Sequence, residues 1–190
     1  MSTPTRRRLQ PEARKQEILE AAVRLFNARG GQVRVEDVTR EAGVAKGTFF
    51  LYFPTWDDLL EAVRQWLVTE FDTANPLPLE ADGPIDWLGL VERQAAAFID
   101  FTLSRQGLGD AIFHSDFAER RPLADNGILR IAAVIRAGQE AQAFAPVDPD
   151  PTARLLFATI HETAEAVARG ADRAASLAAL NHLLRRTLAP

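Results

Sequence analysis

Apolar residues recur every three or four positions along most of this 190-residue chain, which is the spacing of one face of an α-helix. The clearest run lies between residues 11 and 29, where the apolar positions are Ile18, Leu19, Ala22, Val23, Leu25 and Phe26. No alternation of apolar and polar residues is long enough to predict a strand. The pattern therefore predicts an all-α protein of about nine helices.

Glycine, proline and capping residues place the ends of the first helices. We expect a helix over 11–29 that stops at Gly30, and a short helix over 35–42 that stops at Gly43. Thr55 and Asp58 form a Thr-x-x-Asp capping signal for the helix that follows Pro54.

The rest of the chain divides in the same way. Residues 75–87 are rich in Pro and turn-forming residues and are the best candidate for a domain boundary. Asp150 is the expected cap of a helix that has Pro151 in its first turn and ends near Gly170. The other expected helices cover 86–105, 107–117, 126–144 and 173–188.

A short segment between Gly43 and Pro54 carries an unusual density of aromatic residues. Gly43 and Val44 join two short helices, the arrangement of a helix-turn-helix at about 35–53. Phe49 and Phe53 are four residues apart, so both are expected to pack against Val38 and the first helix. The opposite face is expected to point outward and comprises Ala45, Lys46, Thr48, Phe50 and Leu51.

Two features of this second helix suit contact with another molecule. Its first backbone N–H groups and the positive end of its dipole favour a phosphate. Gly47 has no side chain, so a second backbone can approach closely there.

Charge is unevenly divided along the chain. Residues 1–54 hold ten Lys and Arg against six Asp and Glu, a balance of +4. The remainder holds twelve against twenty, a balance of −8, which together give the net charge of −4. The imbalance indicates either an anionic partner for the basic part or an accident of two solvated surfaces.

The segment VEDVTREAGVAKGTFFLYFPTWDDLLEAV, residues 35–63, resembles the DNA-binding segment of the TetR family of bacterial transcriptional repressors. That family's pattern is approximately T-V-x-D-I-A-x-x-A-G-V-S-x-G-x-x-Y-x-Y-F-x-x-K-x-x-L. The helix upstream also matches, so the resemblance covers about residues 12–63. Beyond that point only the length and the helical content are similar.

The resemblance implies a homodimer that binds a roughly two-fold operator in double-stranded DNA. Residues 45–52 would form the recognition helix in the major groove, with phosphate contacts from Thr48 and Tyr52. Lys46 would contact a phosphate or a base edge. The implied DNA-binding residues are Arg6, Arg7, Arg8, Arg34, Ala45, Lys46, Gly47, Thr48, Phe50, Leu51 and Tyr52.

The run Arg6-Arg7-Arg8 is similar to a basic arm that adds salt-dependent affinity, although a solubilising tail would have the same composition.

Four positions depart from the family pattern. Ala45 and Arg34 stand where Ser and Thr are usual, which removes two helix caps worth about 1 kcal/mol each. Phe50 replaces a Tyr, and Trp56 replaces a Lys that touches phosphate. These changes leave an alternative open, in which the protein is a helical small-molecule-binding or protein-interaction module with impaired DNA binding.

The second part of the chain is expected to bind a small apolar or amphipathic effector, unless its aromatic residues only fill the core. Phe98 and Phe101 share one helix face, as do Phe157 and His161. We predict an aromatic-walled pocket with His114, His161 or Gln94 as polar groups. The candidate residues are Trp87, Gln94, Phe98, Phe101, Phe113, His114, Phe117, Phe157 and His161.

The last two helices are apolar on more than one side, and in the family they pair with their two-fold mates. The alternative is a monomer that packs these faces internally. The expected dimer contact would bury about 1,200–2,000 Å² or more. Its candidate residues are Leu156, Ile160, Ala164, Val167, Leu177, Leu180 and Leu184.

An enzyme is not expected. The chain has no cysteine, hence no thiolate nucleophile, and no G-x-S-x-G or phosphate-binding glycine loop is present. The sequence HETAE at His161 lacks the second histidine of a zinc motif, so no metal or other cofactor is expected.

The location is expected to be cytoplasmic, since no apolar run approaches the ~18 residues that span a bilayer, and residues 1–16 lack the apolar core of a secretory signal. We therefore expect a ligand-responsive transcriptional regulator, a repressor, with a DNA-binding domain over 1–54 and an effector-binding and dimerisation domain over 55–190.

Overall fold

The computed structural model describes residues 10–79, 83–113, 116–117 and 126–190. The described residues form nine α-helices and one short 3₁₀ turn, and no strand occurs among them, so the all-α prediction is confirmed. The chain divides into two compact units. Unit 1 is Met1–Leu67 with Gly107–Arg121, and unit 2 is Val68–Gln106 with Pro122–Pro190.

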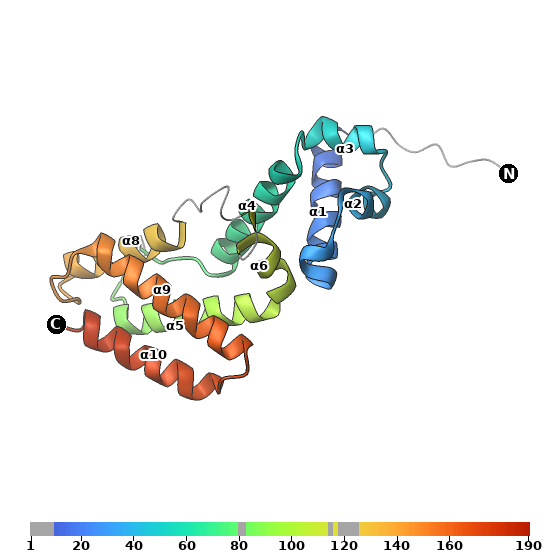
Figure 1. Cartoon of the computed structure of the whole chain (residues 1–190). Coiled ribbons are helices and arrows are strands. Elements are labelled where there is room, and N and C mark those ends of the chain that lie inside the picture. Colours follow the sequence, from blue (N-terminus) through green and yellow to red (C-terminus); the bar gives the residue numbers. More distant parts are fainter. Residues whose placement is uncertain (1–9, 80–82, 114–115, 118–125) are drawn as a thin grey trace. The chain divides into compact units, whose positions relative to one another are not determined.

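Unit 1 begins with α1 (Pro11–Arg29), followed by the 3₁₀ turn at Gly30–Gln32 and by α2 (Val35–Ala42) and α3 (Lys46–Tyr52) (Figure 1). Helix α4 (Trp56–Ala74) starts in this unit. The turn between α2 and α3 depends on Gly43, whose φ of 59° and ψ of 41° are left-handed. Glycine adopts this conformation without strain, which ends α2 and reverses the chain toward α3.

Side-chain caps hold the starts of α4 and α2. The Thr55 N–H donates to the Asp58 carboxylate over 3.0 Å, and the Asp58 N–H donates to the Thr55 hydroxyl over 3.1 Å. This is the predicted capping box. At α2 only one half exists: the Arg34 N–H donates to Asp37 over 3.1 Å, and a guanidinium has no acceptor for the return bond. Ala45 provides no side-chain cap for α3.

The core of unit 1 confirms the expected division of the aromatic segment. Phe49 and Phe53 are buried with ring centroids 5.8 Å apart, and Val38 is buried with them. Phe50 is 40% exposed and lies edge-on to Phe49 with centroids 5.1 Å apart. The same unit contains most of α6 (Gln106–Phe113), where a Cβ at Gly107 would lie 3.0 Å from the Phe26 carbonyl oxygen. Glycine therefore permits this backbone contact.

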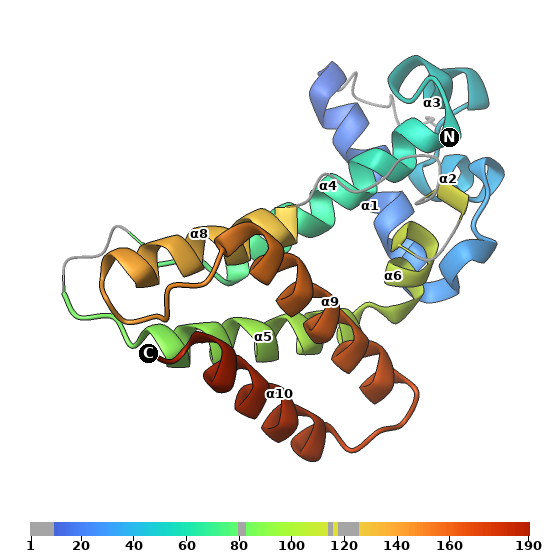
Figure 2. The same cartoon turned by 60° about the vertical axis from the view of Figure 1, so that its left-hand side comes forward.

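Unit 2 contains the end of α4 together with α5 (Trp87–Ser104), α8 (Asn126–Glu140), α9 (Pro149–Ala168) and α10 (Arg173–Leu188). Helix α9 packs against α8, α5 and α10, and α10 also packs against α5 (Figure 2). Two ion pairs join α10 to α5, Arg185 with Glu92 and Arg173 with Asp100. The core is a continuous apolar cluster, and α9 supplies Ala153, Leu156, Ile160 and Ala164 to it.

Two predicted helix ends in unit 2 are wrong by a few residues, and a third agrees with the structure. Helix α9 starts at Pro149 after Asp148, so Asp150 is not its cap; the Asp150 carboxylate instead accepts a hydrogen bond from Arg136 of α8. Helix α9 ends at Ala168, near Gly170 as predicted. Helix α8 ends at Glu140 instead of 144, because the chain turns at Gln142, whose φ is 57°.

The two neighbouring phenylalanines of α3 provide a matched test of this core. We expect Phe49→Ala to lower the free energy of unfolding by about 3–5 kcal/mol, because it empties a fully buried ring site. Phe50→Ala should cost about 1 kcal/mol or less, since its ring is largely exposed. Denaturant unfolding followed by circular dichroism measures both, and equal losses would contradict the assigned orientation of α3.

Candidate nucleic-acid interface and pocket

The outer face of α3 is where the predicted contact residues come together. Leu51 is 76% exposed, and Ala45, Lys46, Gly47 and Phe50 are also exposed. Thr48 and Tyr52 are half-buried at the edges of this face. No atom outside α3 and its immediate neighbours lies within 4 Å of a Cβ placed on Gly47, so this part of the surface is open.

Lys46 has a partner that the sequence did not reveal. Its Nζ lies 2.7 Å from a carboxylate oxygen of Glu36, in the first turn of α2, and both side chains are exposed. The hydrogen bond from Lys46 holds the pKa of the Glu36 carboxyl below its usual value. The charge of Lys46 therefore has an anionic partner within the protein, with which any external anion would compete.

Arg34 is exposed at the N-cap of α2. Its charge also lowers the pKa of Glu36, although less than the hydrogen bond from Lys46 does. The predicted arm Arg6-Arg7-Arg8 lies outside the described residues. Among the described residues Lys46 and Arg34 are thus the two predicted basic contacts that the structure places.

Trp56 explains one departure from the family pattern. Its ring centroid lies 5.9 Å from that of Phe26 and 6.4 Å from that of Phe49. The tryptophan at the start of α4 therefore adds aromatic packing to α1 and α3, where a lysine would present a charge.

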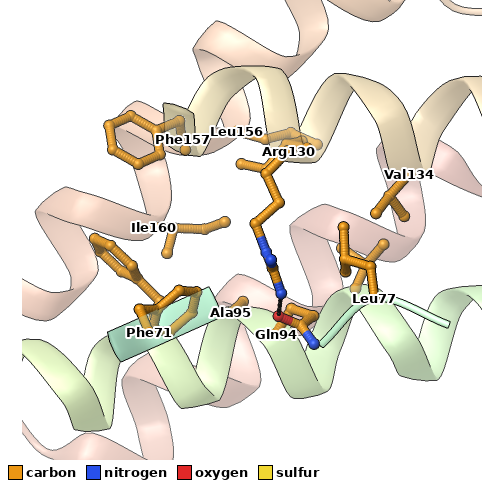
Figure 3. A pocket seen from close by; sticks show the side chains of 13 residues that line it. Phe71, Leu77, Gln94, Ala95, Arg130, Val134, Leu156, Phe157 and Ile160 are labelled. Carbon is orange, nitrogen blue, oxygen red and sulfur yellow. Dashed lines mark hydrogen bonds between the residues drawn. The ribbon is translucent and has the colours of Figure 1, made fainter. Parts of the chain in front are cut away.

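A pocket opens within unit 2 among α4, α5, α8 and α9 (Figure 3). The space among its lining side chains is about 570 Å³, a volume that includes open solvent. Most of its lining is apolar, and only Gln94 and Arg130 carry polar side chains there. The lining residues are Phe71, Leu77, Val91, Gln94, Ala95, Phe98, Gly127, Arg130, Ile131, Val134, Leu156, Phe157 and Ile160.

Arg130 is the main polar group of the pocket wall. Its guanidinium donates to the Asp72 carboxylate over 2.8 Å, to the Gln94 side-chain oxygen over 2.9 Å and to the Asn75 carbonyl. Burial lowers the pKa of Arg130, and the carboxylate of Asp72 opposes that shift. Because Arg130 occupies the Gln94 oxygen, the amide N–H groups of Gln94 are the donors that this residue can still offer.

The predicted pocket residues have different positions in the structure. Gln94, Phe98 and Phe157 line the pocket. His161 does not line it, but its ring centroid lies 6.4 Å from Phe98 and 6.1 Å from Phe157. Phe101 contacts Phe71, and Trp87 contacts Phe144, but neither lines the pocket.

The remaining residues predicted for the pocket are not among those that line it. Phe117 is buried in unit 1 beneath the guanidinium of Arg64, 5.3 Å from its ring centroid, so it is reassigned to that core. His114 and the side chain of Phe113 lie outside the described residues. The sequence pattern did not indicate Arg130 and Phe71, because a lone arginine and a lone phenylalanine on separate helices leave no local signal.

The residues predicted to form the dimer contact need correction. Five of the seven candidate residues are buried in the protomer's own core, because α9 and α10 use these faces against α5 and each other. The five are Leu156, Ile160, Ala164, Leu180 and Leu184. Val167 and Leu177 are half-buried. The exposed apolar residues of these helices are Leu155, Ala158, Ala174, Ala175, Ala178, Ala179 and Leu183.

Two other kinds of site are absent from the part of the chain that the structure describes. No group of three or more His, Cys, Asp or Glu side chains is placed there to hold a metal ion. No helix of that part has both the length and the apolar character to cross a bilayer.

Comparisons with known proteins agree with this geometry. The family model for bacterial regulatory proteins of the tetR family matches residues 18–63, and the model for the tetracyclin repressor-like C-terminal domain matches residues 107–190. The HTH-type transcriptional regulator LuxR of Vibrio harveyi is 40% identical over 67 residues. That match covers 35% of this chain and 33% of the Vibrio protein, about a third of its length.

Solved structures extend the likeness over both units. A TetR-family transcriptional regulator from Pectobacterium atrosepticum has a TM-score of 0.71 at 22% identity and covers 95% of each chain. RolR, solved in complex with its ligand resorcinol, has a TM-score of 0.70 at 20% identity and covers 91% of this chain and 88% of that one. At such identities the likeness shows the fold, and the family models carry the assignment. The chain belongs to the tetR family of bacterial regulatory proteins.

Proposed function

We propose that this protein is a dimeric, ligand-responsive transcriptional repressor of the cytoplasm that binds a two-fold operator. The observation that carries the proposal is the exposed face of α3, on a helix-turn-helix within the family-matched segment. We assign DNA binding to residues 1–54, and ligand binding and dimerisation to residues 55–190.

The DNA contacts follow from the two faces of α3. Because Phe49 and Phe53 fix its inner face in the core, the helix can enter a major groove without losing internal packing. Lys46, Thr48 and Tyr52 are available to phosphates or base edges, and Gly47 lets the DNA approach closely. Arg34 and the arm at Arg6-Arg7-Arg8 would add attraction that depends on salt.

The pocket of unit 2 is the proposed effector site. An apolar cavity with aromatic walls and few polar groups suits a small aromatic or amphipathic molecule. RolR, which has the same fold, takes the small aromatic molecule resorcinol as its ligand. Such a ligand releases the operator only if it binds the DNA-incompetent conformation more tightly than the competent one.

Dimerisation is proposed through the outward faces of α9 and α10. Leu155 is 71% exposed and Leu183 is 40% exposed, and alanines lie beside both. Small residues let two helices approach closely, and the same patch on each protomer would give an isologous contact. A two-fold protein is what a two-fold operator requires.

The DNA-binding proposal is tested by selecting genomic fragments on the purified protein and measuring affinity by fluorescence anisotropy at several salt concentrations. We expect a two-fold sequence with half-sites about one helical turn apart. Lys46→Ala should weaken binding and reduce the salt slope by about 0.9 for each phosphate that the variant no longer neutralises. Glu36→Gln should strengthen binding by about two- to fivefold, because it frees Lys46 and removes a negative charge.

Arg93→Ala, an exposed charge change on α5, is the control and should leave the affinity unaltered. Enrichment of no sequence, with all binding abolished by about 200 mM salt, would support the alternative of a module with impaired DNA binding. Unchanged affinity in both the Lys46 and the Glu36 variants would remove this pair from the interface.

The pocket is tested by a thermal-shift screen of small aromatic and amphipathic compounds, with resorcinol among them. Compounds that enter the pocket should raise the melting temperature and lower operator affinity. Gln94→Leu should lower the affinity for compounds bearing a hydroxyl or carbonyl about tenfold, which is the effect of one hydrogen bond. It should leave the affinity for pure hydrocarbons unaltered. Arg130 keeps Asp72 and the Asn75 carbonyl in this variant. Equal losses for both classes of compound would count against a polar role for Gln94.

The dimer contact is tested by Leu155→Glu combined with Leu183→Glu. Both side chains are exposed in the protomer, so the fold should survive, whereas a pair of buried carboxylates should dissociate the dimer. Size-exclusion chromatography with light scattering measures the mass, and Leu129→Glu on α8, where Leu129 is 59% exposed, is the matched control. A double variant that stays dimeric would place the interface elsewhere.

A further inference from the structure

The outer face of α3 is unusually apolar for a surface that meets DNA. Five large hydrophobic side chains are exposed in the described part of the chain, and two of them, Phe50 and Leu51, are neighbours on this one short helix. The helix belongs to a segment with a positive charge balance, which suits an anionic partner. An exposed apolar pair in that position indicates a contact surface for a partner that is anionic overall and also presents apolar groups.

The polar groups of α3 are few. Its sequence, KGTFFLY, has no Asn, Gln, Arg, Asp or Glu, so the paired hydrogen bonds by which proteins recognise adenine have no donor and acceptor in this helix. Lys46 is its one charged side chain, and Glu36 holds it over 2.7 Å. Thr48 and Tyr52 are half-buried at the margins. Hydrogen bonding from α3 alone therefore gives little discrimination among bases.

The apolar groups, in contrast, are well placed. Leu51 follows Gly47 by four residues, so the two lie on one face, and the surface around Gly47 is open. Phe50 rests edge-on against the buried ring of Phe49, which limits its movement. The methyl groups of Leu51 thus lie beside Gly47, where no other side chain would hinder the approach of DNA.

We propose that Leu51, supported by Phe50, recognises the 5-methyl groups of thymines in the major groove of the operator half-site. The thymine methyl is the apolar group that the major groove presents, and side-chain carbon is its natural contact. This inference rests on the proposed DNA-binding function and adds to it the chemistry by which bases are distinguished. Leu51 becomes a specificity-determining residue, and Lys46 a residue that positions the helix.

The test uses the full-length protein and the operator obtained by selection. Each thymine of a half-site is replaced in turn by deoxyuridine, which keeps base pairing and removes only the methyl group. At one or two positions we expect the affinity of the wild type to fall about fourfold, the effect of removing one buried methyl. Fluorescence anisotropy measures the affinities at a fixed salt concentration.

Leu51→Ala, measured on the thymine and deoxyuridine operators, completes a double-mutant cycle between the side chain and the methyl group. It should weaken binding to the thymine operator and should bind the thymine and deoxyuridine operators equally, because the partner of the methyl is gone. Leu129→Ala, an exposed leucine on α8, should retain the fourfold difference. Circular dichroism confirms that the variants are folded, which the exposure of both leucines favours.

Four outcomes would overturn the inference. A change below twofold at every thymine, or the same fourfold loss in Leu51→Ala as in the wild type, would overturn it while leaving operator binding intact. A Leu51→Ala variant with unaltered operator affinity but a different mass in solution would assign Phe50 and Leu51 to a protein contact. Failure to enrich any operator would overturn the proposed function, and this inference with it.

Discussion

The burial of the Phe49 ring is the interaction on which the candidate interface depends. A seven-residue helix is unstable in water, so α3 exists because its inner face is held by the core of unit 1. The ring centroid of Phe49 lies 5.8 Å from that of Phe53 and 6.4 Å from that of Trp56. Aromatic residues before and after Pro54 therefore pack against Phe49. The same burial fixes the rotation of α3 and thereby determines that Leu51 and Lys46 point outward.

A second constraint shapes the pocket of unit 2. A guanidinium placed in an apolar wall is costly unless its donors are satisfied, and Arg130 has acceptors from the end of α4, from the residue that follows it and from α5. Asp72 and Asn75 at the end of α4, and Gln94 on α5, therefore join these two segments to Arg130 on α8. Since one guanidinium bonds both α5 and the end of α4, a ligand that moved Gln94 would also alter the support of α4.

Local features were predictable from the sequence, whereas long-range ones were not. The capping box at Thr55, the turn at Gly43 and the two faces of α3 follow from residues within a few positions of one another. Asp150 was expected to cap α9, but its partner Arg136 belongs to another helix. The ion pair of Lys46 was missed for the same reason, because its partner Glu36 lies ten residues earlier on another helix. The apolar spacing around Leu184 fits a dimer contact and a protomer core equally well, so the sequence could not distinguish them.

Under the proposed function, the ion pair at Glu36 and the apolar face of α3 would act on different quantities, the first on affinity and the second on specificity. Phosphate contacts form on any DNA sequence, so an anion that competes for Lys46 lowers affinity for the whole genome and for the operator alike. Methyl contacts form only where thymines lie in register, so they add affinity at the operator alone. A regulator searches among a large excess of non-specific sites, and the ratio of the two affinities decides its occupancy. The proposed methyl contacts of Leu51 would raise that ratio, whereas the Glu36 ion pair would lower both affinities by the same factor and leave the ratio unaltered.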